Sequence, residues 1–400
     1  MAKTIVINQP DGDRTPFLRG ILVQSLLNVG LNFEEAYGLA QKVRDDLRDL
    51  EEITSTDLKQ KVAGLLEARF GRSRRLKYLT RPDTEAGIIV HTPTRSEPFS
   101  IGLLAHSLES CAIAPDVALA GARKVYLSLQ KTGHGEINHK TLRKVIFLCL
   151  KEHCSEEAAN RYLSWRRFEN SGDPLIVLIG GVTGTGKSTI AAEVAYRMDI
   201  GRIQSTDMMR EIIRAYLTPE AVPTLRYSSF EAWRGLAAPT EEPAGATENP
   251  VVAGFLSQFV TMKPALGAAI GRAVKERHDL IIEGVHIAPF MMDLTGAQQQ
   301  AIVVPLMLAT RERAALEKQL KRRGREKSGR QAARYLQRID DIWELQSYLL
   351  SEADNAGIPI ITNWHIETTV HEVLNLVMSR VMKRYPPRFS DLDQTLETGV

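Results

Sequence analysis

The clearest chemistry in the sequence lies in residues 181–188, which read GVTGTGKS and fit the phosphate-loop pattern G-x-x-x-x-G-K-[S/T] at every specified position. Glycines in such a loop let backbone N–H groups approach an anion closely. The Lys187 ammonium can reach the β- and γ-phosphates of a nucleotide, and the Ser188 hydroxyl can ligate Mg²⁺. The sequence therefore predicts ATP and Mg²⁺ as cofactors, with nucleotide contacts from Gly181, Thr183, Gly184, Thr185, Gly186, Lys187, Ser188 and Thr189.

Two carboxylates follow apolar segments that are typical of strands. Asp207 comes directly after residues 202–206, and Glu283 ends the run that begins at residue 279. Ligands bind at the carboxyl ends of strands in open parallel sheets. Either carboxylate could orient the attacking oxygen or hold the water shell of the metal, and Asp207 could also serve as the N-cap of a helix over residues 208–216. The predicted catalytic residues are Lys187, Asp207 and Glu283, and the predicted metal site is Ser188, Asp207 and Glu283.

Cationic and aromatic residues near these carboxylates suit a negatively charged acceptor. Residues 205–210, STDMMR, resemble the piece of adenylate-kinase-type enzymes in which an arginine holds the acceptor's phosphate. Residues 226–233 lie where kinases of this class carry an insertion that closes over the acceptor. Solvated arginines, aromatic packing and a hydrogen-bonded structural histidine are the competing interpretations. The predicted substrate residues are Arg210, Arg214, Arg226, Trp233 and His286.

A basic segment follows the next expected strand. Residues 311–330 carry nine Lys or Arg against three Glu, a local charge of +6 in a chain whose net charge is only +3. An arginine-rich segment at this position typically forms a lid whose guanidinium groups neutralise the transferring phosphoryl group. A solvated basic helix is the alternative. The predicted lid residues are Arg322, Arg323, Arg325 and Arg330.

These side chains need a scaffold, and the pattern of apolar residues predicts one. Five apolar segments alternate with amphipathic helices from residue 175 onward, which predicts an α/β fold with a five-stranded parallel sheet. Residues 171–385 would form this domain, and residues 386–400 a flexible tail. A helix over residues 57–70 and a capping box at Asn32 and Glu35 are expected near the N-terminus.

The first 170 residues contain an internal repeat. Residues 16–47 align without a gap with residues 98–129, so two mainly helical units are expected, at 1–86 and 87–170. The first unit resembles the ATP-cone, a regulatory nucleotide-binding module, through Ile5-Val6-Ile7, Asp11-Gly12, Arg14 and Pro16-Phe17. The second unit lacks the Asp-Gly turn, and Ile21 replaces a lysine that the ATP-cone carries. A structural or dimerising role for the repeats is the alternative.

Composition excludes several classes. The small net charge gives no bulk attraction to nucleic acid or an anionic membrane. Three cysteines without paired spacing suit a reducing compartment, and the first residues have no apolar signal core, so a cytoplasmic protein is expected. The partners expected are a small phosphorylated acceptor and, through the N-terminal repeats, a second copy of the chain.

The order of these parts resembles the 2-phosphoglycerate kinase family, a P-loop kinase behind an ATP-cone-like N-terminus. Residues 16–17, 20–22, 179–189, 228–233 and 282–286 carry that resemblance, while the duplicated N-terminal unit departs from it. The resemblance implies transfer of phosphate from ATP to 2-phosphoglycerate, giving 2,3-bisphosphoglycerate and ADP. The alternatives are a kinase for a nucleotide or an inositol phosphate, and a nucleotide-gated protein that binds a partner.

Overall fold

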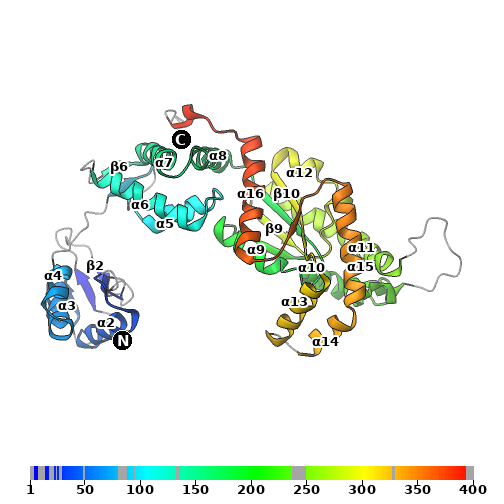
Figure 1. The fold of residues 1–400 in the computed structure, drawn as a ribbon, viewed down its shortest axis with the longest axis horizontal. Helices are drawn as coiled ribbons and strands as arrows, with labels where there is room; N and C mark the ends of the chain where they lie inside the picture. Colours follow the sequence, from blue (N-terminus) through cyan, green and yellow to red (C-terminus); the bar gives the residue numbers. More distant parts are fainter. Residues whose placement is uncertain are drawn as a thin grey trace. The chain divides into compact units, whose positions relative to one another are not determined.

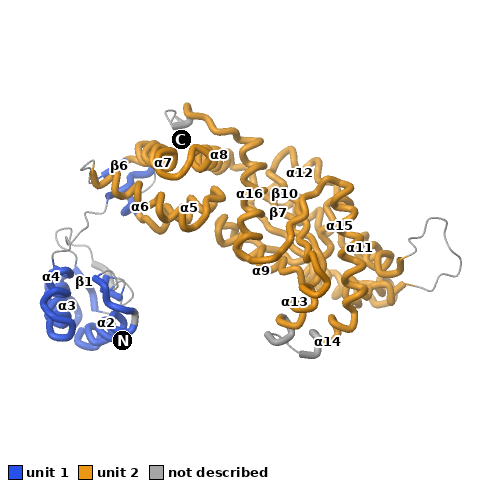
Figure 2. The backbone as a smooth tube through the Cα atoms, viewed as in Figure 1, with its two compact units in different colours: residues 1–99, 134–137 blue, residues 100–133, 138–400 orange. Residues whose placement is uncertain are grey.

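The structure is a computed structural model that describes residues 4–7, 14–17, 22–23, 25–26, 29–47, 50–79, 88–93, 96–131, 136–236, 249–326 and 329–392. The chain divides into two compact units, residues 1–99 with 134–137 and residues 100–133 with 138–400 (Figure 2). The expected Asp11-Gly12 turn and Ile21 lie outside the described residues, as do residues 393–400.

The larger unit is built on a five-stranded sheet, as the sequence predicted. The strand order is β11-β10-β7-β9-β8, and all four pairings are parallel. All six residues of β7 are buried because helices cover both faces of the sheet (Figure 1). The strands are β7 (Leu175–Gly180), β8 (Ile203–Ser205), β9 (Leu280–Glu283), β10 (Ile302–Ala309) and β11 (Ile360–Thr362).

Two groups of helices enclose the sheet. Helices α9 and α16 pack on each other, and α11 packs on α12 and α15 (Figure 1). Ile176 and Leu178 of β7 face Leu266 and Ile270 of α11, because alternate strand residues point to the same face. The helices are α9 (Lys187–Arg197), α10 (Thr206–Tyr216), α11 (Pro250–Glu276), α12 (Thr295–Gln300), α13 (Arg313–Glu326), α14 (Gly329–Gln337), α15 (Ile339–Asn355) and α16 (Ile366–Arg384).

Short 3-10 helices complete this part of the chain. The insertion between α10 and α11 contains η1 (Pro223–Arg226) and η2 (Ser229–Gly235), and η2 packs closely on α11. The others are η3 (Pro289–Met291) and η4 (Phe389–Leu392). In η4 the Phe389 ring packs edge-on against Phe147, with the ring centroids 5.0 Å apart.

Helix α11 is long and apolar enough, by length and composition alone, to cross a membrane, and 44% of its most apolar window is buried in the protein. Phe255, Phe259 and Leu266 of this helix are fully buried, which is also the behaviour of the core helix of a globular domain.

The N-terminal repeat is visible as a repeated order of elements. The first copy has the strand order β2-β1-β3 and the second has β5-β4-β6, each with a β-hairpin and a third strand. The first comprises β1 (Ile5–Ile7), β2 (Arg14–Pro16), α2 (Phe33–Asp46), β3 (Glu52–Thr54), α3 (Ser55–Phe70) and α4 (Arg72–Leu79). The second comprises β4 (Ile89–His91), β5 (Ser96–Pro98), α5 (Ile101–Glu109), α6 (Pro115–Lys131), β6 (Glu136–Asn138), α7 (His139–His153) and α8 (Glu156–Ser171).

Two of the local elements in the repeats match the predictions from the sequence, and two strands were not predicted. The capping box at Asn32 and Glu35 is confirmed, and so is the helix predicted from residue 57, which begins two residues earlier. The third strands, β3 and β6, were not predicted, because three residues are too few to show an alternating pattern. The helices of the second copy belong to the larger unit, where Arg161 of α8 donates a hydrogen bond to Asn375 of α16.

Candidate active site

The phosphate loop joins β7 to the N-terminus of α9. Helix α9 begins after Gly186, whose φ of 86° lies in the left-handed region, and no side chain caps it. The N-terminal N–H groups and the helix dipole therefore face the loop, which suits an anion. Gly181, with φ 135°, lies so close to β10 that an added Cβ would stand 2.4 Å from the Leu308 carbonyl oxygen.

Lys187 and Thr185 shape the loop from within. The nearly buried Lys187 ammonium donates a hydrogen bond to the Val182 carbonyl at 2.8 Å, and the Thr185 hydroxyl donates to the same oxygen at 2.9 Å. The Thr185 side chain is fully buried. Thr185 therefore stabilises the conformation of the loop. Ser188 and Thr189, in contrast, are exposed to solvent.

Ser188 and Glu283 are joined directly, although 95 residues separate them. The Ser188 hydroxyl donates to Glu283 Oε1 at 2.9 Å, and the Glu283 side chain is buried at the end of β9. The neighbouring strands explain this meeting, since Ile179 of β7 pairs with Glu283. A hydroxyl and a carboxylate oxygen are hard ligands of the kind that Mg²⁺ takes beside nucleotide phosphates. The described residues contain no cluster of three or more His, Cys, Asp or Glu side chains that could hold a metal without such phosphates.

Asp207 lies at the same edge of the sheet, one strand further out. Ser205 of β8 pairs with Glu283, so Asp207 follows two residues beyond that register. Its carboxylate is 71% exposed and forms an ion pair with Arg210 at 3.7 Å. The alternative role as an N-cap is wrong, because Ser205 caps α10 and accepts from the Asp207 N–H.

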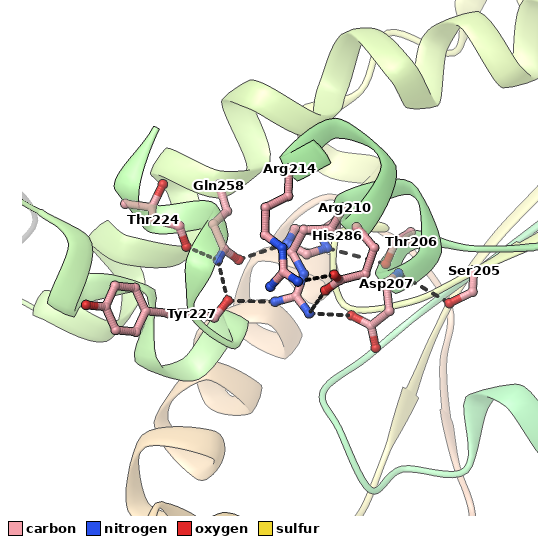
Figure 3. A network of polar contacts seen from close by, with 10 residues as sticks. Ser205, Thr206, Asp207, Arg210, Arg214, Thr224, Tyr227, Gln258 and His286 are labelled. Atoms are coloured by element: carbon pink, nitrogen blue, oxygen red, sulfur yellow. Dashed lines mark hydrogen bonds and ion pairs between the residues drawn. The ribbon is translucent and has the colours of Figure 1, made fainter. Parts of the chain in front are cut away.

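His286 lies in the middle of a buried polar network (Figure 3). Its ring is fully buried, its Nδ1 lies 3.3 Å from the Thr206 hydroxyl, and its Nε2 lies 3.0 Å from Gln258 Oε1. The Gln258 amide in turn donates to the carbonyls of Thr224 and Tyr227. Because Gln258 Oε1 only accepts, His286 Nε2 carries the proton. Both ring nitrogens are thus engaged within the protein, which favours the structural interpretation of His286 over direct contact with an acceptor.

Burial also sets the ionisation state of this histidine. Desolvation, helped by the nearby Arg210 and Lys187 charges and opposed by Asp207, lowers the pKa of His286 to about 4. The imidazole is therefore neutral near pH 7. This is consistent with one donated and one accepted hydrogen bond.

The remaining predicted substrate residues divide into two groups. Arg210 is mostly buried, donates to the Tyr227 carbonyl at 2.6 Å, and has an Nε without a partner in the described part of the chain (Figure 3). Trp233 likewise has a buried Nε1 without a partner among those residues. Arg214 pairs with Glu211, and the exposed Arg226 donates to the Leu217 carbonyl. The structure therefore brings Arg210 to Asp207, and engages Arg214 and Arg226 in local contacts.

A cavity of about 270 Å³ opens beside the phosphate loop. Gly184, Gly186 and Lys187 line one side, and Arg322 of α13 lines another. Arg323 lies in α13 with Arg325, and Arg330 lies in α14, but the side chains of these three are outside the described residues.

Asn363 and Trp364 complete this cavity and were not predicted. Asn363 Nδ2 donates to the Thr185 carbonyl at 2.9 Å, and the Trp364 ring is 63% exposed with the Arg311 guanidinium 5.7 Å from its centroid. Both residues directly follow β11, so the reasoning that found Glu283 at the end of β9 could have found them. Gln258 and Glu231 gave no comparable signal, because the residues that they contact come from distant segments.

Comparison with known proteins gives consistent relatives. The 2-phosphoglycerate kinase of Pyrococcus horikoshii is 38% identical over 288 residues, which cover 72% of this chain and 92% of that protein. The 2-phosphoglycerate kinase of Pyrococcus furiosus is 36% identical (72% and 91% covered), and that of Methanopyrus kandleri is 35% identical (79% and 91%). No family model matches the chain. A gluconokinase from Sinorhizobium meliloti superposes with a TM-score of only 0.30 at 13% identity, covering 53% of this chain and 94% of that one.

Proposed function

The chain belongs to the 2-phosphoglycerate kinase family, and from that premise we propose that it transfers the γ-phosphoryl group of ATP to the 3-hydroxyl of 2-phosphoglycerate, giving 2,3-bisphosphoglycerate and ADP. One observation carries the proposal. The Ser188 hydroxyl donates a hydrogen bond to the buried Glu283 carboxylate at 2.9 Å beside the phosphate loop. Two groups that could hold Mg²⁺ therefore lie next to the residues that could bind the nucleotide phosphates. A phosphotransferase with ATP as donor follows from the family.

The chain's own residues can perform the transfer by positioning and electrostatics. The Lys187 ammonium and the α9 N-terminus would hold the β- and γ-phosphates, and Arg322 would reach them from α13. Mg²⁺, when bound, would neutralise phosphate charge, held by the Ser188 hydroxyl with Glu283 behind its water shell. The exposed ring of Trp364 offers a surface on which a purine base can stack.

We assign different roles to the two carboxylates. Glu283 is buried and bonded to Ser188, so we place it in the metal shell. Asp207 is exposed and paired with Arg210, so we propose that it orients the acceptor hydroxyl and accepts its proton as the new O–P bond forms and the bond to ADP breaks. Glu283→Gln should then raise the Mg²⁺ concentration needed for half-maximal rate, whereas Asp207→Asn should lower kcat at saturating Mg²⁺.

The decisive assay measures ADP formation with and without 2-phosphoglycerate. We expect turnover that depends on the acceptor and falls by at least about 10²-fold in Lys187→Ala, because a charge that stabilises the transition state is lost. Lys275→Ala, an exposed lysine of α11, is the matched control. A panel with a nucleoside monophosphate and an inositol phosphate tests the other acceptors. ADP formation at the same rate with every acceptor and with none would refute the kinase assignment.

We further propose that the N-terminal repeats are ATP-cone-like modules that bind regulatory nucleotide. The resemblance at residues 5–7 and 14–17 supports this, together with the hairpin and helices that follow in each copy. Full-length Lys187→Ala, in which the phosphate loop is disabled, should retain ATP binding at the repeats. Complete loss of ATP binding in this variant, with a dimer that dissociates on deletion of residues 1–86, would favour a dimerising role instead.

A further inference from the structure

A buried carboxylate in the insertion gathers three arginines. The Glu231 side chain of η2 is only 3% exposed. Arg334 of α14 lies within hydrogen-bonding distance of Glu231 Oε2. Arg338 Nε, between α14 and α15, lies 3.6 Å from Oε1, and Arg234 Nη1 lies 3.7 Å from the same oxygen. Two segments that are 100 residues apart in sequence therefore supply cations to one point.

The number of cations exceeds what the buried charge requires. One arginine would satisfy the carboxylate of Glu231, because an ion pair with one partner already removes the isolated charge. Asp341 Oδ2 lies 3.5 Å from Arg338 Nη1, so the three arginines together with Glu231 and Asp341 carry a formal net charge of +1, from three positive and two negative groups. A guanidinium has five N–H donors, and two carboxylate oxygens accept about four hydrogen bonds in all. Surplus N–H groups therefore remain, and the three side chains are each about one-third to one-half exposed.

An unsatisfied donor stands beside this cluster. The Trp233 ring lies under the Arg234 guanidinium at 5.6 Å, and Trp233 Nε1 is buried without a partner among the described residues. A buried N–H of this kind costs free energy until an acceptor reaches it. An anion with several oxygens, such as phosphate, would satisfy both the surplus guanidinium N–H groups and this indole.

The cluster is tied to the phosphate loop by shared packing. Phe230, next to Glu231, packs edge-on against Tyr335 of α14 at 5.8 Å. The same apolar core contains Val182 of the phosphate loop and Leu316 of α13. The segments that carry the arginines therefore pack on the same core as the phosphate loop.

We propose that Glu231 orders Arg234, Arg334 and Arg338 into a binding site for the phosphate group of the acceptor, separate from the phosphate loop. The arginines contact the anion, and Glu231 is a positioning residue that holds them together across η2 and α14. This inference rests on the proposed function, in which the acceptor already carries a phosphate. It also explains how a kinase could select a phosphorylated acid over the same acid without phosphate.

Kinetics of the full-length protein test the site. Arg334→Gln and Arg338→Gln should each raise KM for 2-phosphoglycerate by about tenfold or more, since each removes charge-assisted hydrogen bonds to the anion. KM for ATP should stay within about twofold of wild type. Glu231→Gln keeps the size but removes the charge, and should also raise KM for the acceptor. Arg272→Gln, an exposed α11 arginine paired with Glu276, is the matched control.

Discrimination between acceptors separates binding from a merely structural ion pair. Wild type should prefer 2-phosphoglycerate to glycerate, and Arg334→Gln should lower that ratio of kcat/KM values by the same factor that it raises KM. If Arg334→Gln lowers Tm and reduces kcat/KM equally for 2-phosphoglycerate and for glycerate, the cluster only holds α14 against η2, and the inference is wrong.

A binding experiment keeps this inference distinct from the proposed function. Equilibrium dialysis of radiolabelled inorganic phosphate, with ADP saturating the phosphate loop, should show a site in wild type that Arg334→Gln weakens at least tenfold. If wild type does not turn over 2-phosphoglycerate but this site is present, the proposed function fails and the anion site stands. Equal phosphate binding by wild type and Arg334→Gln would overturn the site itself.

Discussion

Replacing His286 with glutamine removes a buried imidazole but keeps one of its hydrogen bonds. A glutamine amide at this position can still donate to Gln258 Oε1, as His286 Nε2 does. The acceptor for Thr206 and the stacked contact with Phe255, at 6.0 Å and 18°, are lost. At pH 8, where the histidine is neutral in both states, we expect the variant to lose about 1–2 kcal/mol of the free energy of unfolding.

The effect should reverse as the pH falls. In the folded protein the pKa of His286 is lowered from 6.5 to about 4, so the unfolded chain binds a proton first as the pH drops. The stability that comes from burying the neutral ring is complete above the unfolded pKa and is lost progressively between pH 6.5 and pH 4. The linkage relation gives a loss of about 2 kcal/mol at pH 5 and about 3 kcal/mol below pH 4. The variant, which cannot titrate here, avoids that loss.

Urea unfolding at pH 8 and pH 5 measures both effects. All four tryptophans (Trp165, Trp233, Trp343 and Trp364) lie in the larger unit, so their fluorescence reports its unfolding. From pH 8 to pH 5 the free energy of unfolding of wild type should fall by about 2 kcal/mol relative to that of His286→Gln, so that the variant becomes at least as stable as wild type. His365→Gln makes the same chemical change at an exposed position and is the control. A gap that stays constant with pH would refute the assignment of His286 as a buried neutral ring.

Further substitutions test the packing of α11 and the contacts around the phosphate loop. Gly254→Ala would bring a Cβ within 2.1 Å of the Trp233 backbone N, so we expect the free energy of unfolding in urea to fall by about 1–3 kcal/mol. Gly267→Ala on the same helix meets open space and should raise that free energy by up to about 1 kcal/mol. Equal effects of the two substitutions would contradict this reasoning. Asn363→Ala frees a carbonyl of the phosphate loop and should raise KM for ATP about fivefold, while an unchanged KM would show that the brace is dispensable. Trp364→Ala should raise KM for ATP about tenfold, whereas Trp364→Phe, which keeps an aromatic ring, should raise it much less. Equal increases of KM in the two variants would exclude stacking of the purine base on the Trp364 ring.

The sequence determined the local parts of this protein. The octapeptide 181–188, the alternation of strands with helices and the duplication before residue 170 are properties of neighbouring residues, so they could be predicted without tertiary contacts. The parallel sheet followed, and with it the edge where Glu283 and Asp207 lie, because the carboxyl ends of parallel strands share one edge.

Only the tertiary structure decided how these parts combine. The strand order β10-β7-β9-β8 brought Ser188 to the buried Glu283 and left Asp207 exposed. The two carboxylates therefore differ in burial and in partner, although the sequence pattern predicted the same roles for both. Thr206 of α10 and Phe255 and Gln258 of α11 surround the buried His286, and this burial lowers its pKa. The meeting of Glu231 with Arg334, 103 residues away, gave no local signal. A periodic pattern of apolar residues predicts which face of a segment is buried, but not which distant segment packs on that face. The polar contacts of the site depend on that packing partner.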